Sequence, residues 1–145
     1  MLRNIPPILS PDLLHCLAAM GHGDTIVIAD ANFPGASMAA NCIRLDGIAA
    51  TEVLRAIVTL MPLDTFTARP ARTMQVVGDA AAVPAVVAEF QKIIDESADH
   101  PADITTLERF AFYEQAKAAF AIVQTGELRL YGNIILTKGV VAPTS

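Results

Sequence analysis

The sequence predicts an α/β protein: a single-domain three-layer α/β/α sandwich whose central sheet is mainly parallel or mixed. Segments with apolar residues at helical spacing alternate with short apolar strands, which is typical of helices packed on both faces of a sheet. The strand at 25–29 consists of β-branched and small apolar residues without alternating polar positions, as expected when both faces of a strand are buried. The length of 145 residues is near the commonest domain size, so we expect one domain over 1–145.

The first elements have clear sequence signals. Ser10-Pro11-Asp12 has the features of a helix start, namely a hydroxyl cap, a proline in the first turn and an acid near the positive end of the helix dipole. Gly21 is expected to end this helix in the left-handed conformation, which glycine adopts without steric penalty. A buried strand follows at 25–29, and 30–40 is predicted to be a loop that frames a pocket.

The rest of the chain continues the alternation. The predicted elements are a strand at 42–45, a helix capped by Thr51 and running to Met61, a strand at 73–77, a helix started by Pro84, a strand at 104–107, a helix at 109–117, and strands at 121–123 and 133–136. Leu60 and Val83 are expected on the buried faces of their helices. The order of the strands does not follow from this pattern.

The composition limits the possible partners. Hydrophobic residues make up 53% of the chain and charged residues 17%, against about 25% charged in an average soluble protein. No apolar run reaches the ~18 residues of a membrane span, so large subunit interfaces are the expected place for the surplus apolar residues. A net charge of −5 without a Lys/Arg cluster argues against nucleic acid, and the absence of a signal-peptide pattern predicts a cytoplasmic protein.

A histidine and an aspartate on either side of the strand at 25–29 are the first candidate site residues. His22 lies between two glycines, and imidazole exchanges protons near neutral pH. Asp30 follows the strand directly, at the end where open α/β sheets bind ligands. Because a carboxylate accepts hydrogen bonds from two hydroxyls at once, the pair suggests proton transfer on a polyhydroxylated substrate. A helix-capping histidine and a turn-forming aspartate are the alternative interpretation.

Two further groups have both a functional and a structural interpretation. Arg109 and Tyr113 are four residues apart and share a helix face, where they either line a site or simply pack at a helix start. In the segment 131–133, Gly132 permits close approach of a ligand and Asn133 offers both a donor and an acceptor; the alternative is an edge turn. Dinucleotide, P-loop, serine-hydrolase and zinc-protease motifs are missing, and no histidine or cysteine has metal-ligand spacing.

Several motifs together are more specific than any one of them. They are Gly21-His22-Gly23-Asp24, Asp30-Ala31-x-Phe33-Pro34, Arg109-Phe110-Ala111-Phe112-Tyr113-Glu114, Thr125-Gly126-Glu127 and Tyr131-Gly132-Asn133-Ile134-Ile135-Leu136-x-Lys138-Gly139-Val140. This set resembles the ribose pyranase/fucose mutarotase family over nearly the whole chain. The segment Phe112-Tyr113-Glu114 is similar to the fucose mutarotase branch.

The resemblance implies a homo-oligomeric ring, often a decamer, that interconverts the anomers of a free monosaccharide, with L-fucose favoured. Ring opening and reclosure is acid–base chemistry that needs no cofactor and no metal. By resemblance, His22 is an acid/base group and Tyr113 the second proton handler. The sugar-holding positions that it implies are Asp30, Asp64, Arg109, Tyr131 and Asn133. We expect the segment 131–133 to close the pocket that holds His22 of a neighbouring subunit.

Other functions remain open at this point. A non-catalytic sugar-binding or transport-accessory protein would use the same pocket without accelerating anomer exchange. A ribose-type pyranase would act on a different sugar. An isomerase or epimerase acting at carbon would exchange the hydrogen at C2 with solvent.

Overall fold

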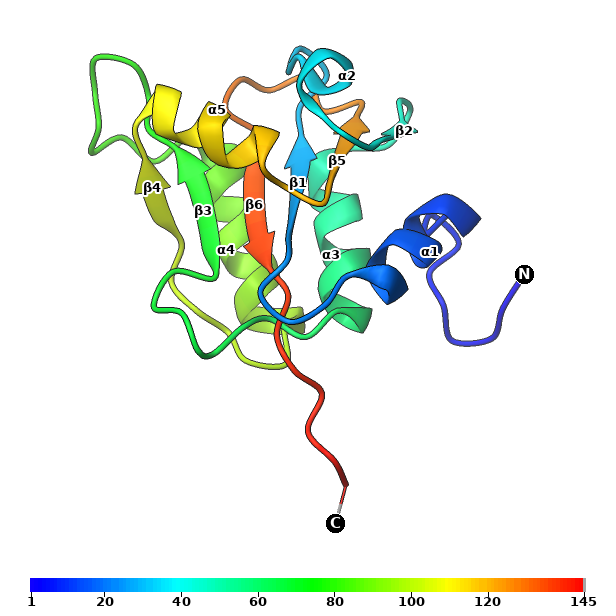
Figure 1. Ribbon diagram of the computed structural model, residues 1–145. Helices are drawn as coiled ribbons and strands as arrows, with labels where there is room; N and C mark the ends of the chain where they lie inside the picture. The colour runs from blue at the N-terminus through cyan, green and yellow to red at the C-terminus, as the bar shows by residue number, and fades with distance from the viewer. Residues whose placement is uncertain (145) are drawn as a thin grey trace.

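A computed structural model of the chain describes residues 1–144, in which six strands form one sheet in the order β2-β5-β1-β6-β3-β4 (Figure 1). The strands are β1 (Thr25–Ala29), β2 (Cys42–Leu45), β3 (Ala71–Met74), β4 (Thr105–Leu107), β5 (Ala121–Thr125) and β6 (Ile134–Thr137). Of these six, five run in the same direction, and β6 is antiparallel to its neighbours β1 and β3. The predicted α/β class is therefore confirmed, with a mixed sheet.

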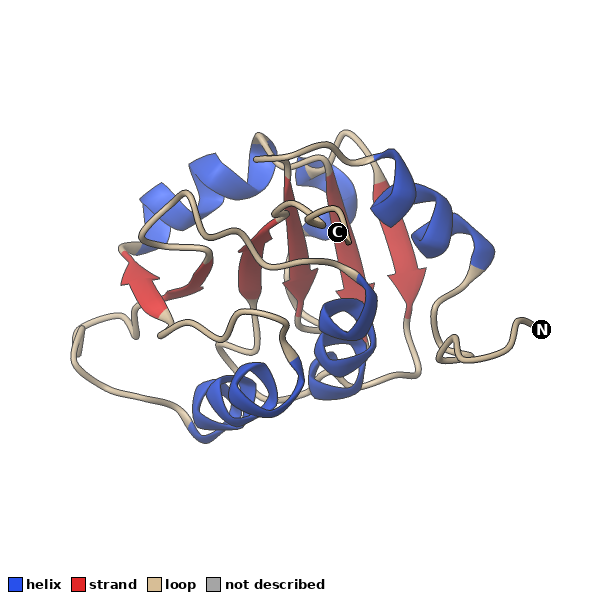
Figure 2. Ribbon diagram, turned by 90° about the horizontal axis from the view of Figure 1, so that it is seen from below, coloured by secondary structure: helices blue, strands red, loops and turns tan. Residues whose placement is uncertain are grey.

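Helices cover both faces of this sheet. They are α1 (Pro11–Ala19), α2 (Gly35–Met38), α3 (Ala50–Leu60), α4 (Ala85–Ser97) and α5 (Arg109–Lys117). The buried residues of α1, α3 and α4 belong to one hydrophobic cluster, and those of α5 belong to a second. In Figure 1, α5 crosses the near face of the sheet while α3 and α4 lie behind it, and Figure 2 shows the strands between helices on both sides.

The central strand β1 contributes side chains to both clusters. Ile26 and Ile28 pack with α3 and α4, whereas Val27 and Ala29 pack on the opposite face with α5. All four side chains are fully buried. Because neither face of the strand meets water, an apolar residue is favoured at every position, which explains why the sequence shows no alternation there.

The end of α1 differs from the prediction. The helix starts as expected, with the Ser10 Oγ accepting a hydrogen bond from a backbone N–H of the first turn, but it ends at Ala19. Gly21 is not left-handed, and the positive φ of this loop falls on Gly23, at +88°. The physical reason is Lys138, whose Nζ donates to two carbonyl oxygens at this helix end and so replaces a left-handed cap.

The helices α3 and α4 also differ from the prediction in detail. Ala49 is the N-cap of α3, so Thr51 lies inside the helix and does not cap it. Leu60 is 37% exposed and Val83 68% exposed, so the prediction that both are buried is wrong. Leu60 is the last residue of α3, and Val83 lies before the first residue of α4. Both residues are therefore at helix ends, beyond the part of the apolar helix face that packs on the sheet.

Two loops differ from the predicted pattern in ways that affect the pocket. β3 covers Ala71–Met74 rather than 73–77, because its pairing with β6 starts at Ala71 and the chain turns away after Met74. Val77, predicted to lie in a strand, is instead 61% exposed on the following loop. The predicted loop at 30–40 contains the short helix α2.

Candidate active site

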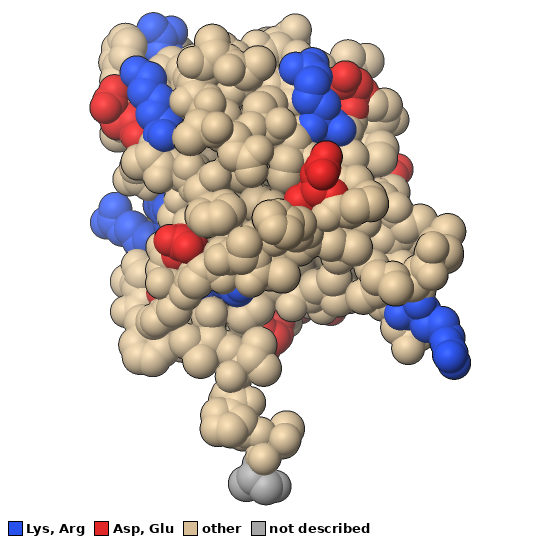
Figure 3. Space-filling view, turned by 45° about the vertical axis from the view of Figure 1, so that its right-hand side comes forward, with Lys and Arg blue, Asp and Glu red and all other residues tan. Residues whose placement is uncertain are grey.

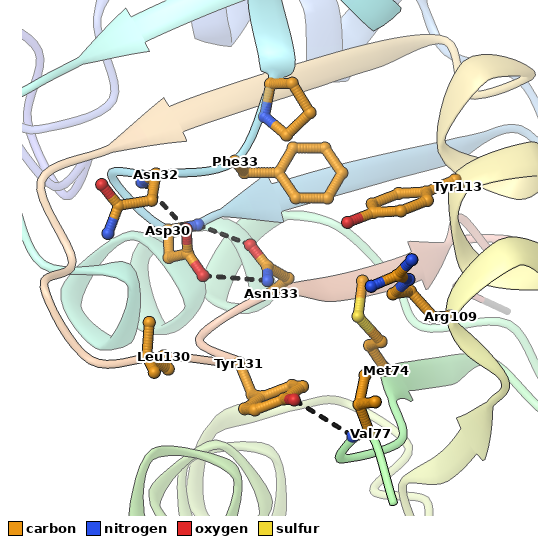
Figure 4. A pocket seen from close by; sticks show the side chains of 11 residues that line it. Asp30, Asn32, Phe33, Met74, Val77, Arg109, Tyr113, Leu130, Tyr131 and Asn133 are labelled. Carbon is orange, nitrogen blue, oxygen red and sulfur yellow. Dashed lines mark hydrogen bonds between the residues drawn. The ribbon is translucent and has the colours of Figure 1, made fainter.

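A pocket of about 230 Å³ opens at the edge of the sheet where the five parallel strands end and β6 begins (Figure 4). Five of the predicted site residues line it, and they come from three separate segments of the chain: Asp30, Arg109, Tyr113, Tyr131 and Asn133. Phe33, Met74, Val77 and Leu130 supply apolar walls. The carboxyl edge of the sheet thus carries a pocket with polar groups and apolar walls. Asp30 lies in it, at the end of its strand where a ligand site was predicted.

Asp30 and Asn133 form its buried floor. The Asp30 backbone N–H donates to Asn133 Oδ1 at 2.6 Å, and Asn133 Nδ2 donates to Asp30 Oδ2 at 3.0 Å. The other carboxylate oxygen accepts from the Asn32 backbone N–H at 3.0 Å. Burial raises the pKa of Asp30, and the hydrogen bonds from Asn32 and Asn133 offset only part of that effect.

The α5 wall carries the predicted Arg109–Tyr113 pair. Glu108 fixes the start of this helix, because its carboxylate accepts from two backbone N–H groups of the first turn at 3.0 and 3.2 Å. One turn separates the two side chains, and both line the pocket, as predicted. The Tyr113 ring packs against Phe33 with centroids 5.9 Å apart, and the Arg109 guanidinium lies 4.7 Å from the centre of the Phe110 ring.

Tyr131 enters the pocket from a constrained loop. Its φ of +65° is unusual for a residue with a side chain. Its hydroxyl accepts a hydrogen bond of 3.0 Å from the Val77 backbone N–H, which ties the loop after β3 to the loop before β6. An aromatic residue held in this region of conformational space costs roughly 1–3 kcal/mol, a strain that occurs mainly at functional sites.

An ion-pair network holds the same loop against α4. Arg129 lies 2.8 Å from Glu89 and 3.0 Å from Glu127. A hydrogen bond from Arg129 lowers the pKa of Glu127, against the opposing effect of burial. A Cβ on Gly132 would come within 2.8 Å of the Glu127 Cγ, so this glycine makes room for Glu127. Gly132 was predicted to permit close approach of a ligand, but in the structure it permits close packing of Glu127 instead.

His22 and Asp64 form a separate pair at the opposite edge of the sheet. His22 Nε2 lies 2.9 Å from Asp64 Oδ1, and Asp64 Oδ2 accepts from the Thr67 backbone N–H at 3.0 Å. Asp64 is 5% exposed, and the His22 side chain is 43% exposed. Burial alone would raise the pKa of Asp64, but hydrogen bonds from Phe66, His22 and Thr67 outweigh it and lower that pKa.

The loop that carries His22 is fixed by backbone hydrogen bonds to the segment after β6. The Gly23 N–H donates to the Lys138 carbonyl and the Lys138 N–H donates to the Asp24 carbonyl, both at 2.9 Å. Asp24 Oδ2 also accepts from the Gly21 N–H at 2.8 Å. The imidazole is therefore presented from a rigid turn.

Within one chain, the structure separates the predicted residues into two groups. His22 precedes β1 and Asp30 follows it, and a five-residue strand is ~17 Å long at about 3.3 Å per residue. Tyr113 lies with Asp30, so the two predicted proton handlers are not adjacent. Asp64, predicted among the sugar-holding residues, contacts His22 instead.

Phe66 is a neighbour of His22 that sequence analysis missed. Its ring centroid lies 4.8 Å from that of His22, and the residue is 78% exposed. Its position two residues after Asp64 was the available signal, but nothing in the pattern shows that an aromatic side chain there faces solvent.

Two results bear on other classes of protein. No helix among residues 1–144 is long and apolar enough to cross a membrane. Within the same residues, no three histidine, cysteine or acidic side chains come together as a metal-binding group.

The mixed sheet, with a pocket of carboxylate, amide, phenol and guanidinium groups at its carboxyl edge, defines an α/β protein suited to a small hydroxylated ligand. A model described as the RbsD / FucU transport protein family matches residues 3–141, and the chain belongs to this family. The predicted family is thus confirmed.

Similar proteins are known at nearly full length. The chain is 45% identical to a fucose mutarotase of Homo sapiens, covering 97% of this chain and 95% of that protein. It is 44% identical to a fucose mutarotase of Bos taurus, with 99% and 96% covered. A crystal structure of the fucose mutarotase of Streptococcus pneumoniae in complex with L-fucose is 47% identical, with 97% and 100% covered and a TM-score of 0.90.

Proposed function

We propose that this chain is an isomerase of the racemase/epimerase class that interconverts the α and β anomers of L-fucose. The observation that carries this function is the pocket around Asp30 and Asn133, in a chain 47% identical to a fucose mutarotase whose crystal structure contains L-fucose. We further propose that 1–145 is a single mutarotase domain acting in the cytoplasm.

The pocket matches the surface of a 6-deoxy sugar. Both Asp30 carboxylate oxygens keep acceptor capacity after their protein hydrogen bonds and would receive sugar hydroxyls. The Arg109 side chain, which is exposed and makes no hydrogen bond within residues 1–144, would donate to hydroxyl oxygens. The apolar walls formed by Phe33, Met74 and Leu130 would contact the sugar's C–H faces and its methyl group.

The reaction requires two proton transfers and no change of oxidation state. One group protonates the ring oxygen while another removes the proton of the anomeric hydroxyl, so the C1–ring oxygen bond breaks and an aldehyde forms. Rotation about the C1–C2 bond presents the other carbonyl face, and the reverse transfers reclose the ring. The Tyr113 phenol lines the pocket and serves as one proton handler, and His22 serves as the other.

His22 would reach this chemistry from a neighbouring copy of the chain. In one chain His22 and the pocket lie at opposite edges of the sheet, which supports a site completed across a subunit interface. Exposed apolar residues lie near both halves: Phe66 beside His22, and Leu130 on the pocket wall, 68% exposed. Figure 3 shows blue and red side chains scattered over one face without a large cluster of one sign. These surfaces support a homo-oligomeric ring, and we propose a decamer.

Asp64 would act through His22. An ionised carboxylate accepts the Nε2–H of the imidazole, which leaves Nδ1 as the basic atom. The lowered pKa of Asp64 keeps the carboxylate ionised, so this tautomer is retained. Asp64 is therefore a positioning residue in this proposal.

Saturation-transfer NMR of the two L-fucose anomers tests the proposed function. Protein should increase the exchange rate between the anomeric signals catalytically, without deuterium appearing at C2 in heavy water. A sugar-binding or transport-accessory protein would shift or broaden the signals and leave the exchange rate unchanged. Deuterium at C2 would indicate isomerisation at carbon, and faster exchange of D-ribose than of L-fucose would indicate a ribose-type pyranase.

A further inference from the structure

A second hollow, separate from the pocket around Asp30, lies beside the end of α5 that faces the opposite edge of the sheet. Its volume is about 380 Å³, and its lining includes Arg72, Gln115, Asp24 and Phe120. None of these side chains lines the pocket around Asp30. The proposed mutarotase reaction gives the hollow no role.

Arg72 is the unusual feature of this hollow. The residue lies on β3 and is only 8% exposed. Its Nε–H donates to Gln115 Oε1 at 2.8 Å, and its Nη1 donates to the Arg69 carbonyl and to Thr137 Oγ1. Among residues 1–144, its Nη2 has no hydrogen-bond acceptor.

The buried guanidinium also lacks a counter-charge within residues 1–144. The ion pairs of the described residues involve other cations, and none involves Arg72. Burial is the sole cause that lowers the pKa of Arg72, with no carboxylate opposing it. Because arginine stays charged and a buried unpaired charge is costly, a negative group from outside the chain would be stabilised beside Arg72.

Gln115 provides a second donor. Its Oε1 accepts from Arg72, so its amide nitrogen points away from the guanidinium. That Nε2 has no acceptor among residues 1–144. Asp24 supplies the carboxylate among the side chains that line the hollow, and its Oδ2 accepts a hydrogen bond from the Gly21 N–H. The free groups at the Arg72 end are therefore all donors, a set that matches an oxyanion.

We propose that Arg72 Nη2 and Gln115 Nε2 form a binding site for a small oxyanion of the phosphate or carboxylate type. The anion occupies the Arg72 end of the hollow, away from the Asp24 carboxylate. Phosphate free in solution and a carboxylate of a second copy of this chain offer the same chemistry, and the experiment separates these two sources. The site is independent of the proposed mutarotase function.

Thermal unfolding in sodium phosphate, compared with sodium chloride at equal ionic strength, tests the site. A ligand at ten times its Kd should raise the Tm by roughly 3–6 °C for a chain of this size. Arg72→Gln should abolish the phosphate-specific shift, and Gln115→Leu, which keeps the guanidinium, should weaken phosphate binding several-fold. Asp24→Asn should strengthen it, because a nearby negative charge is removed. Arg44→Gln is the matched control, since Arg44 is exposed and paired with Asp46, and its shift should equal that of the unmodified chain.

Light scattering identifies the source of the anion. A phosphate-specific shift in an intact oligomer supports free phosphate. Absence of a shift, together with dissociation of the oligomer by both Arg72→Gln and Gln115→Leu, supports the carboxylate of a second copy. An equal shift in chloride, retention of the shift in Arg72→Gln, or neither binding nor dissociation overturns the proposal.

Discussion

Asn133 holds both the backbone and the carboxylate of Asp30, although the two residues lie 103 positions apart in the chain. One amide side chain accepts from the Asp30 N–H and donates to its Oδ2, and both residues are nearly fully buried. The end of β1 is thereby fixed to the start of β6. A carboxylate oriented in this way would bind a sugar hydroxyl, as the proposed function requires, without first losing rotational freedom.

Asn133→Ala should lower the free energy of unfolding by about 1–3 kcal/mol, because the buried Asp30 N–H loses its acceptor. Urea denaturation measures the change, and sugar affinity should fall with it. Asn32→Ala is the matched control: Asn32 is exposed on the pocket rim and its side chain makes no hydrogen bond among residues 1–144. Equal stability of the two variants would contradict the role of Asn133.

His22→Ala should reduce anomer exchange to near the spontaneous rate while leaving sugar affinity in place. A general acid–base group typically contributes roughly 10²–10⁴-fold. Saturation-transfer NMR gives the rate, and titration of the sugar signals gives the affinity. His15→Ala, which removes an exposed histidine on α1, should behave like the unmodified chain. Full activity of His22→Ala would exclude the imidazole from the reaction.

Asp64→Asn should lower kcat about tenfold or more with little change in KM, because removing a carboxylate that orients a functional histidine typically costs activity on that scale. Its stability should also depend on pH. A lowered carboxyl pKa contributes stability above the ordinary value of 3.8, and that contribution is lost as pH falls through the lower folded value. The stability difference between the two proteins should therefore be constant near neutral pH and shrink in acid. A constant difference throughout would refute this account.

As the pH is lowered, sugar affinity should begin to fall at a higher pH than it would if Asp30 had the ordinary pKa of an aspartate. Burial raises the pKa of Asp30, so the folded carboxyl group takes up its proton above the ordinary value of 3.8. Protonation replaces an acceptor with a donor, and hydroxyl binding weakens. Sugar titrations across the acid range should give a midpoint above 3.8. A midpoint at or below that value would assign the acid loss to another group.

Two inactive variants should restore each other's activity when they are mixed. His22→Ala lacks the imidazole but keeps its pocket, and Arg109→Ala keeps the imidazole but lacks a pocket residue. On random assembly about a quarter of the shared sites would combine both intact halves. Arg109 is suited to this test because its side chain is exposed and makes no hydrogen bond within residues 1–144. Mixed oligomers, verified with tagged subunits, that stay as inactive as the parents would place the complete site within one chain.

Local sequence patterns were sufficient for most elements. β1 and β2 occur at the predicted residues, as does α5, because an apolar run between turn residues and a helical repeat are local signals. The motifs also identified the family correctly. The errors fall at element ends, such as Gly21 and Thr51, where one residue more or less of helix costs little free energy.

What the sequence by itself determined is the α/β class, the family and the residue types available for acid–base and hydroxyl chemistry. Tertiary structure decided which of them meet. The order β2-β5-β1-β6-β3-β4 brings Asn133 to Asp30 and places Asp64 on His22, at the other end of β1. Strand order depends on contacts between distant segments, whereas sequence periodicity reports only on near neighbours. For the same reason the unpaired guanidinium of Arg72 was invisible in the sequence, because burial and a missing counter-charge are properties of the folded chain.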